Sequence, residues 1–154
     1  MSVSVDLRDF ERAFGDLEAG LRNGAHQALV SAVKAAFTSA KTTTLFKDGP
    51  DAKLRDSITM GTPDPLGGFI RAGGRGAGYA VFVEAGTKAH EIRAKNGGSL
   101  RFVVAGRTMF RKVVRHPGTQ ARPFMGRAAD VGEQTLDYGL EFFSERPIAR
   151  FNEG

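Results

Sequence analysis

Apolar residues near the start of the chain recur at the spacing of a helix. They follow one another at intervals of three and four, which places them on one helical face, and they are Leu7, Phe10, Phe14, Leu17, Leu21, Leu29, Val33, Ala36 and Phe37. The pattern weakens at Gly20–Gly24, where each glycine lowers helix stability by roughly 1 kcal/mol relative to alanine. The pattern predicts a helix over residues 6–44 that is continuous, kinked or broken into two helices at these glycines. Its apolar stripe is typical of a core face, and a coiled-coil-like contact with a neighbouring subunit is the alternative.

After the loop signal DGPDAKL, which begins at Asp48, the apolar residues recur with a period of two. Short β-branched or aromatic runs, separated by glycine and proline, then cover residues 57–60, 68–72, 80–85, 100–104 and 108–114. The linker Ala105–Arg107 is too short for a crossover and suits an antiparallel hairpin. These features predict a small antiparallel sheet, interrupted by a long polar loop at Thr87–Ser99.

A second helix is predicted to begin at Pro123, because proline fits the first helical position, where its missing N–H costs nothing. Its apolar face comprises Phe124, Met125, Ala128, Val131, Leu136, Leu140 and Phe143. Arg146-Pro147 predicts its end. The order of elements predicts a single α+β domain over residues 1–154. Its parts are a helical region at 1–46, a sheet at 57–114, a C-terminal helix at 123–146 packed on the sheet, and a tail at 147–154.

Composition narrows the classes of function. The chain has 154 residues and no cysteine, which excludes disulfide scaffolds, thiol nucleophiles and cysteine zinc sites. Its start lacks the pattern of a secretory signal, and no run approaches the roughly 18 apolar residues of a membrane span. The formal net charge of +5 makes the chain mildly basic, with charges that are scattered instead of gathered in a block.

Candidate catalytic and metal-binding patterns are incomplete. His90-Glu91 begins like the zinc motif H-E-x-x-H, but Ala94 occupies the place of the second histidine. The glycine-rich run Gly73–Gly78 has Tyr79 where a dinucleotide fingerprint needs its third glycine. Serine and aspartate occur only in cap and turn contexts, so no Ser-His-Asp triad can be assembled. We therefore expect no catalytic residue, no metal and no cofactor.

The middle third of the chain is basic and contains aromatic residues. Its cations are Arg71, Arg75, Lys88, Arg93, Lys95, Arg101, Arg107, Arg111, Lys112, Arg115 and Arg122, and its aromatic residues are Phe69, Tyr79, Phe82, Phe102 and Phe110. The aromatic residues mostly fall at alternating strand positions, as in a sheet core, although a stacking platform for single strands has the same pattern. A basic nucleic-acid-binding module is one hypothesis. Basic loops that contact acidic surfaces of adjacent subunits are the other.

Four segments, taken in order, resemble one protein family. They are KLRDSI from Lys53, YAVFVEAGT from Tyr79, IRAKNGGSLRF from Ile92 and VRHPGTQARPFMGRAA from Val114. The chain resembles the small neck and tail-completion proteins of long-tailed bacteriophages over about half of its length. The resemblance implies a virion structural protein of the head–tail joint, with no enzymatic activity. Such a protein is a head-side connector or a tail terminator, and it forms a closed ring of six or twelve subunits around the DNA channel.

The same resemblance implies partners and contact residues. The partners are further copies of the chain, head-completion or connector proteins and the tail tube protein; assembly takes place in the bacterial cytoplasm, DNA is only passing cargo, and no membrane is involved. Gly86 and Gly118 would serve backbone turns, and Glu84 would pair with a cation such as Arg122. The loop Thr87–Ser99 and the tail would contact a neighbouring subunit. The family residues carry over to Phe82, Glu84, Gly86, Thr87, His116, Pro117, Gly118, Arg122, Pro123 and Phe124.

Overall fold

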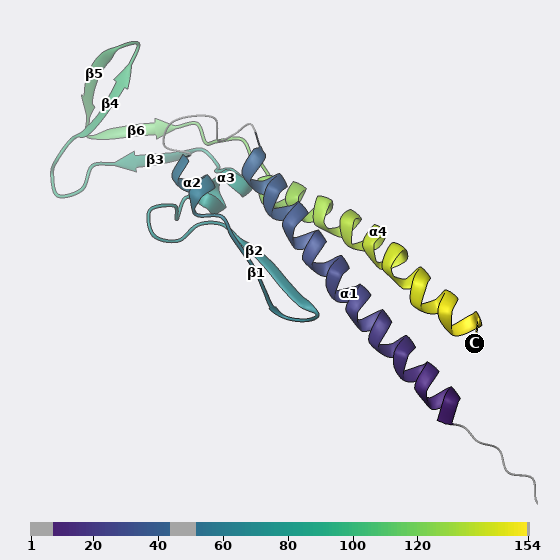
Figure 1. Cartoon of the computed structure of the whole chain (residues 1–154). Helices are drawn as coiled ribbons and strands as arrows, with labels where there is room; N and C mark the ends of the chain where they lie inside the picture. Colours follow the sequence, from purple (N-terminus) through teal and green to yellow (C-terminus); the bar gives the residue numbers. More distant parts are fainter. Residues whose placement is uncertain (1–7, 44–51, 154) are drawn as a thin grey trace, which may run out of the picture. The chain divides into compact units, whose positions relative to one another are not determined.

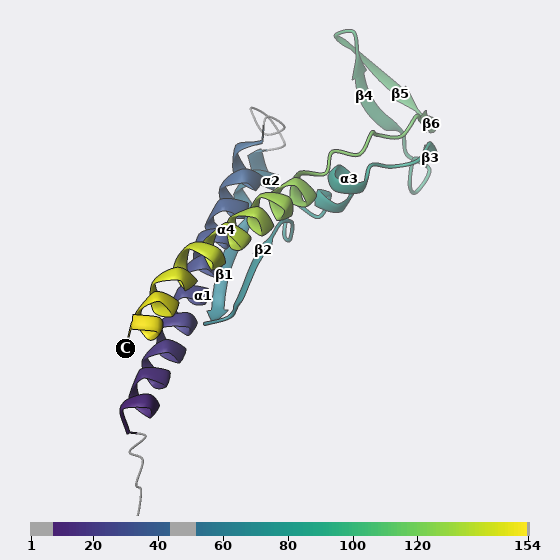
Figure 2. The same cartoon turned by 90° about the vertical axis from the view of Figure 1, so that its right-hand side faces the viewer.

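The structure is a computed structural model that describes residues 8–43 and 52–153 (Figures 1 and 2). The chain divides into two compact units: residues 1–77 with 124–154, here called the helical unit, and Gly78–Pro123, called the hairpin unit. Residues 1–7, 44–51 and 154 lie outside the described residues, and with them the predicted start of the first helix and Leu7. The elements are α1 (Arg8–Thr42), α2 (Ala52–Asp56), β1 (Thr59–Asp64), β2 (Gly67–Arg71), α3 (Ala80–Ala85), β3 (His90–Arg93), β4 (Leu100–Val104), β5 (Arg107–Arg111), β6 (Val113–His116) and α4 (Phe124–Glu153).

The two long helices of the helical unit pack against each other through small residues. α1 is continuous through Gly20–Gly24, so the glycines do not break it into two helices. α1 and α4 lie side by side and antiparallel (Figures 1 and 2), with Gly20 next to Pro147 and Ala28 next to Gly139. Residues at i and i+4 form one ridge of a helix, and short side chains let two ridges approach closely. The buried residues of α1 include such a series, spaced by four: Gly24, Ala28, Ala32, Ala36 and Ala40.

Two glycines set how closely the helices approach. A Cβ atom on Gly24 would lie 2.9 Å from the backbone oxygen of Phe143, and one on Gly139 would lie 2.9 Å from Cβ of Ala28. Side-chain carbons do not approach their neighbours so closely, so a larger residue at either position would push the helices apart. Gly24 weakens the helix pattern in the sequence, yet it stabilises the helix pair.

The interior of the helical unit uses smaller side chains than the apolar pattern predicts. Phe10 and Phe14, both predicted to face a core, are 59% and 53% exposed. Their rings stack with centroids 6.3 Å apart. Among the described residues, the largest fully buried side chains are Phe124, Leu54 and Ile58. The interior therefore combines the α1 alanines with the start of α4 and the segment from α2 to β1.

α4 continues past the proline that was predicted to end it. Pro147 lies inside the helix, so the predicted tail at 147–154 is helical as far as Glu153. An internal proline removes the hydrogen bond to the carbonyl four residues earlier, here that of Phe143, at a cost of about 3 kcal/mol. A Cβ on Gly20 would lie 3.0 Å from the proline ring, so this glycine makes room for it. Packing on α1 offsets the cost. α1 is the main partner of α4, whereas the sequence predicted that α4 packs on the sheet.

The described strands form three two-stranded antiparallel sheets, where the sequence predicts one sheet. β1 pairs with β2, β3 with β6 and β4 with β5. β4 has its predicted bounds, and Ala105 and Gly106 after it have φ angles of 48° and 76°, as a two-residue type I′ hairpin turn requires. The predicted strand 108–114 divides at Lys112 into β5 and β6, and the predicted strands 57–60 and 68–72 correspond to the shifted β1 and β2.

Two assignments in the hairpin unit were wrong. Residues 80–85 form the helix α3 instead of a strand, because the N–H groups of Phe82 and Val83 donate to the oxygen of Tyr79 at 2.9 and 3.2 Å. A strand needs a partner for its backbone groups, whereas this helical turn satisfies them locally. The predicted loop Thr87–Ser99 contains β3, whose partner β6 lies about twenty residues later in the sequence.

Candidate functional site

The segments EAGT and HPGT meet inside the hairpin unit. The N–H of Thr87 donates to the oxygen of Thr119 at 2.9 Å, and the N–H of Thr119 donates to the oxygen of Thr87 at 3.1 Å. Their hydroxyl oxygens lie 3.0 Å apart. These bonds join the chain before β3 to the chain after β6, at a point that we call the junction (Gly86, Thr87, Gly118 and Thr119).

Both glycines of the junction have backbone conformations that disfavour a side chain. Gly86 ends α3 with a φ of 70°, and Gly118 has the positive φ that its turn predicts, 92°. A Cβ on Gly86 would lie 2.6 Å from the oxygen of Thr119, and one on Gly118 would overlap the oxygen of Thr87. Each glycine therefore makes a turn and also leaves room for the opposite segment.

Two histidines stack beside the junction. His90 of β3 lies directly opposite His116 of β6, with ring centroids 5.1 Å apart. Nδ1 of His116 accepts the N–H of Gly118 at 3.1 Å, so the His116 side chain holds the turn. Nδ1 of His90 donates to the oxygen of Lys88 at 2.8 Å. His90 is thus a strand residue, and its place opposite His116 was missed because the sequence indicated a loop.

An open groove of about 610 Å³ runs along the junction. Phe82 of α3, Ile92 of β3 and the two histidine rings line it. Phe82 and its neighbour Val81 are both more than half exposed. A shallow groove with these carbon-rich walls suits an apolar side chain of another protein.

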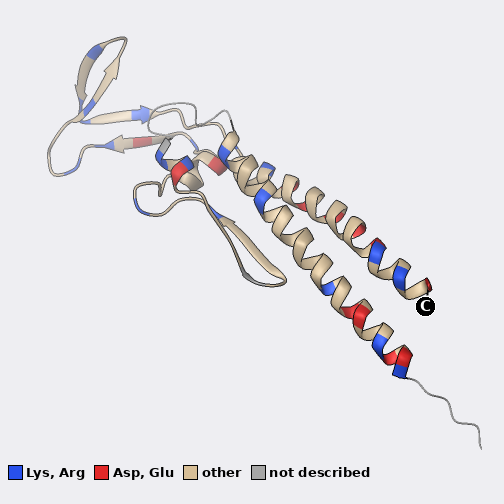
Figure 3. Ribbon diagram, viewed as in Figure 1, with Lys and Arg blue, Asp and Glu red and all other residues tan. Residues whose placement is uncertain are grey.

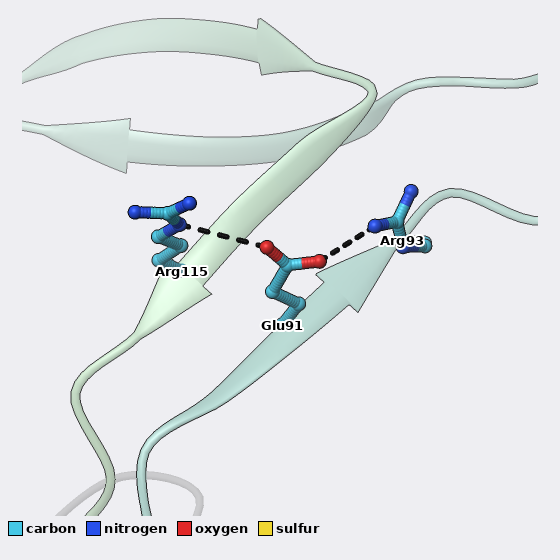
Figure 4. A network of polar contacts seen from close by, with 3 residues as sticks. All are labelled: Glu91, Arg93 and Arg115. Carbon is cyan, nitrogen blue, oxygen red and sulfur yellow. Dashed lines mark hydrogen bonds and ion pairs between the residues drawn. The ribbon is translucent and has the colours of Figure 1, made fainter.

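One acidic residue holds two arginines on the β3–β6 pair (Figure 4). Oε2 of Glu91 lies 2.7 Å from Nη2 of Arg93, and Oε1 lies 3.5 Å from Nε of Arg115. All three side chains are exposed, and exposed ion pairs contribute at most about 1 kcal/mol each. The network therefore orients surface charges more than it stabilises the unit.

The hairpin unit carries the positive charge of the protein. Residues Gly78–Pro123 contain nine Lys and Arg and two Glu, a formal charge of +7, whereas the whole chain has +5. The rest of the chain is therefore slightly acidic, at −2. Figure 3 shows Lys and Arg along the strands of this unit. The sequence revealed the basic middle third but not this separation, because the unit's boundary depends on contacts between distant segments.

The hairpin unit has almost no interior. Among its residues, all of which the structure describes, Ala80 alone is buried. More than half of the surface is exposed for each of Val81, Phe82, Val103, Val104 and Phe110. Two-stranded hairpins without a core are marginally stable in water, and exposed apolar groups of this kind mark contact surfaces.

The ten predicted site residues lie in different surroundings. The backbone N–H of Arg122 donates to the oxygen of Val83 at 2.9 Å. The pairing of the Arg122 side chain with Glu84 stays a prediction. Pro123 directly precedes α4, whereas Phe124 is buried in the helical unit and belongs to its core. The residues that the structure brings together at the junction and its groove are Phe82, Gly86, Thr87, His116, Pro117 and Gly118.

Within residues 8–43 and 52–153, no helix is both long and apolar enough to cross a membrane, and no three metal-ligating side chains gather in one place. Comparisons with protein-family models, curated proteins and solved structures found no match for this chain. The function is therefore argued from the junction, the charge distribution and the exposed apolar residues.

Proposed function

We propose that this protein is a structural component of a bacteriophage virion at the head–tail joint, where copies of the chain form a ring around the DNA channel. The observation that carries the proposal is the hairpin unit, in which Ala80 alone is buried while five large apolar side chains are more than half exposed. Such a surface gives a monomer no stability, whereas a subunit of an assembly covers it against its neighbours.

The junction supports a structural role. The segment YAVFVEAGT supplies α3, Gly86 and Thr87, and the segment that begins at Val114 supplies Gly118 and Thr119. The resemblance to neck and tail-completion proteins thus rests partly on residues that meet in space. At their centre, glycine, threonine and histidine make hydrogen bonds to backbone groups. This is the chemistry of a scaffold rather than of catalysis.

In this role, the partners are further copies of the chain, a connector or head-completion protein and the tail tube protein. A ring requires a heterologous interface, in which one surface of a subunit binds a different surface of the next. DNA passes through the ring without sequence-specific contacts. Two complementary surfaces on each subunit are therefore expected.

A second candidate is a basic nucleic-acid-binding module. The formal charge of +7 on the hairpin unit favours it, because Lys and Arg neutralise phosphates and release counterions. Phe82 and Phe110 are exposed and are of the type on which bases stack. Under this function the hairpin unit binds DNA or RNA, and self-association is not required.

A paired measurement separates the two functions. Light scattering gives the molecular mass, and titration of fluorescent duplex DNA at two salt concentrations gives affinity and its salt dependence. The virion role predicts a ring, or a monomer that assembles only on a phage connector or tail, with weak DNA binding. A stable monomer that binds DNA below about micromolar at physiological salt, with a log–log slope of about −0.9 per phosphate contact, would contradict the virion role.

A further inference from the structure

One side of α4 is acidic over more than four turns. Between residues 128 and 145 the helix has five acidic residues and no Lys or Arg. Their spacing of three or four places them on one side of the helix, whereas the buried Ala128, Gly132 and Gly139 mark the side that contacts α1. Figure 3 shows acidic positions along α4. The five acidic residues are all exposed, and they are Asp130, Glu133, Asp137, Glu141 and Glu145.

Exposed aromatic residues flank the acidic side. Tyr138 and Phe142 are 69% and 51% exposed, and their rings stack with centroids 6.2 Å apart. Val131 lies two turns before Tyr138 and is also exposed, although the sequence placed it on a core face. An aromatic pair bordered by charged groups has the composition of a protein–protein contact, with an apolar centre and a polar rim. We call Val131, Tyr138, Phe142 and the five acidic residues the outer face of α4.

The β4–β5 hairpin has complementary features. Val103 and Phe110 are 63% and 58% exposed. The register places Arg101 opposite Phe110 and Val103 opposite Thr108, so these four residues share one face of the hairpin. Arg107 and Arg111, both exposed, stand at the two ends of β5 and project from the opposite face of the hairpin. The first face thus offers two exposed apolar side chains beside Arg101, on a hairpin that contains three arginines and no acidic residue.

We propose that the β4–β5 hairpin of one copy docks on the outer face of α4 of the next copy. This inference rests on the ring proposed above and names its interface. Val103 and Phe110 cover Tyr138 and Phe142, and Arg101 faces the carboxylates of the helix. Burial of the aromatic pair provides affinity, while the opposite charges set orientation and speed of association.

The charges also determine which surfaces meet. Contact between two hairpin units would bring two formal charges of +7 together, and contact between two α4 faces would bring two of −5 together. Like charges at an interface disfavour association, so only the contact of the hairpin with the helix brings opposite charges together. Repeated from copy to copy, this head-to-tail contact closes a ring. A nucleic acid could cover the hairpin but would be repelled by α4, whereas a second copy accounts for both surfaces.

Charge reversal tests the interface. One variant carries Asp137→Arg and Glu141→Arg on α4, and the other carries Arg101→Glu on the hairpin. Matched controls make the same charge changes at exposed positions elsewhere: Glu11→Arg with Glu18→Arg, and Lys34→Glu. Mass photometry at about 0.1 M salt, where charges interact over roughly 10 Å, measures assembly, and circular dichroism checks folding.

Each interface variant alone is expected to self-associate at least about tenfold more weakly than the wild type, while both controls assemble normally. An equimolar mixture of the two variants restores assembly, because every hairpin then finds an α4 face of opposite charge. Restoration also shows that neither variant is merely misfolded. Wild-type rings with variants that assemble equally well would contradict this interface and leave the ring in place. A wild type that stays monomeric, with DNA binding lost in the hairpin variant, would overturn both.

Discussion

Gly86 and Gly118 each meet two separate requirements, a positive φ and the absence of a Cβ atom. Gly97 offers a comparison within the same unit, because its φ is 72° but nothing lies within 4 Å of an added Cβ. Substitution at Gly97 therefore strains only the local backbone. Substitution at Gly118 adds an overlap with the backbone of Thr87 and Lys88, which cannot move without opening the junction.

The variants Gly118→Ala and Gly97→Ala separate these effects. Both pay roughly 1–2 kcal/mol for a side chain at positive φ. Only Gly118→Ala also separates the two segments, and we expect a further loss of roughly 1–3 kcal/mol in the stability of the junction. Hydrogen exchange of the β3 and β6 amides measures this loss locally. Equal acceleration of exchange in both variants would mean that the close contact is unimportant.

Between the helices α1 and α4, too, a glycine leaves room for the backbone of the opposite element. Gly15 and Gly24 both lie inside α1, but only Gly24 has a neighbour in the way of a side chain, the carbonyl oxygen of Phe143. That carbonyl has lost the hydrogen bond that Pro147 cannot donate. The glycine spacing of α1 thus accommodates a proline in α4 that the sequence alone marks as a helix end.

Alanine at Gly15 and at Gly24 should change the free energy of unfolding in opposite directions. Gly15→Ala should raise the free energy of unfolding by up to about 1 kcal/mol, because alanine favours the helix and meets open space. Gly24→Ala has the same intrinsic gain but forces α4 away, and we expect a net loss of about 1–3 kcal/mol. Urea denaturation followed by circular dichroism at 222 nm measures both. Stabilisation by both substitutions would show that the helices do not pack through Gly24.

Elements with local signals were predictable from the sequence. Alternation identified β4, the short linker identified its hairpin turn, and Pro123 marked the start of α4 within one residue. The wrong assignments depended on partners distant in the sequence. Residues 80–85 have strand-like composition, but none of the described strands pairs with them, and β3 was hidden because its partner follows only after a hairpin.

The core and the candidate site illustrate the same limit. The apolar spacing predicted Phe10 and Phe14 as core residues but, of the buried alanines of α1, only Ala36, because small side chains give a weak hydrophobic signal. Gly86 and Gly118 of the junction, and His116 beside it, were expected from the family resemblance. Their meeting, some thirty residues apart in the chain, could be found only in the structure.

At the scale of the whole molecule, the two units reach stability differently. The helical unit buries a seam of small residues, whereas the hairpin unit relies on backbone pairing and exposes its apolar side chains.

The segment between β3 and β4, residues 94–99, should therefore be accessible in free subunits and covered in assemblies. We expect trypsin to cleave first at Lys95 in the free protein and much more slowly in rings, while Lys34 in α1 is protected in both. Equal cleavage at Lys95 in both forms would contradict this.

Negative-stain imaging of the purified protein tests the central claim most directly. The account predicts closed rings with rotational symmetry around an open channel, formed at low salt or on a phage connector or tail. Because opposite charges contribute to the contact between subunits, fewer rings should form as salt is raised. Isolated single subunits at every protein and salt concentration, with no rings on phage particles, would contradict the account.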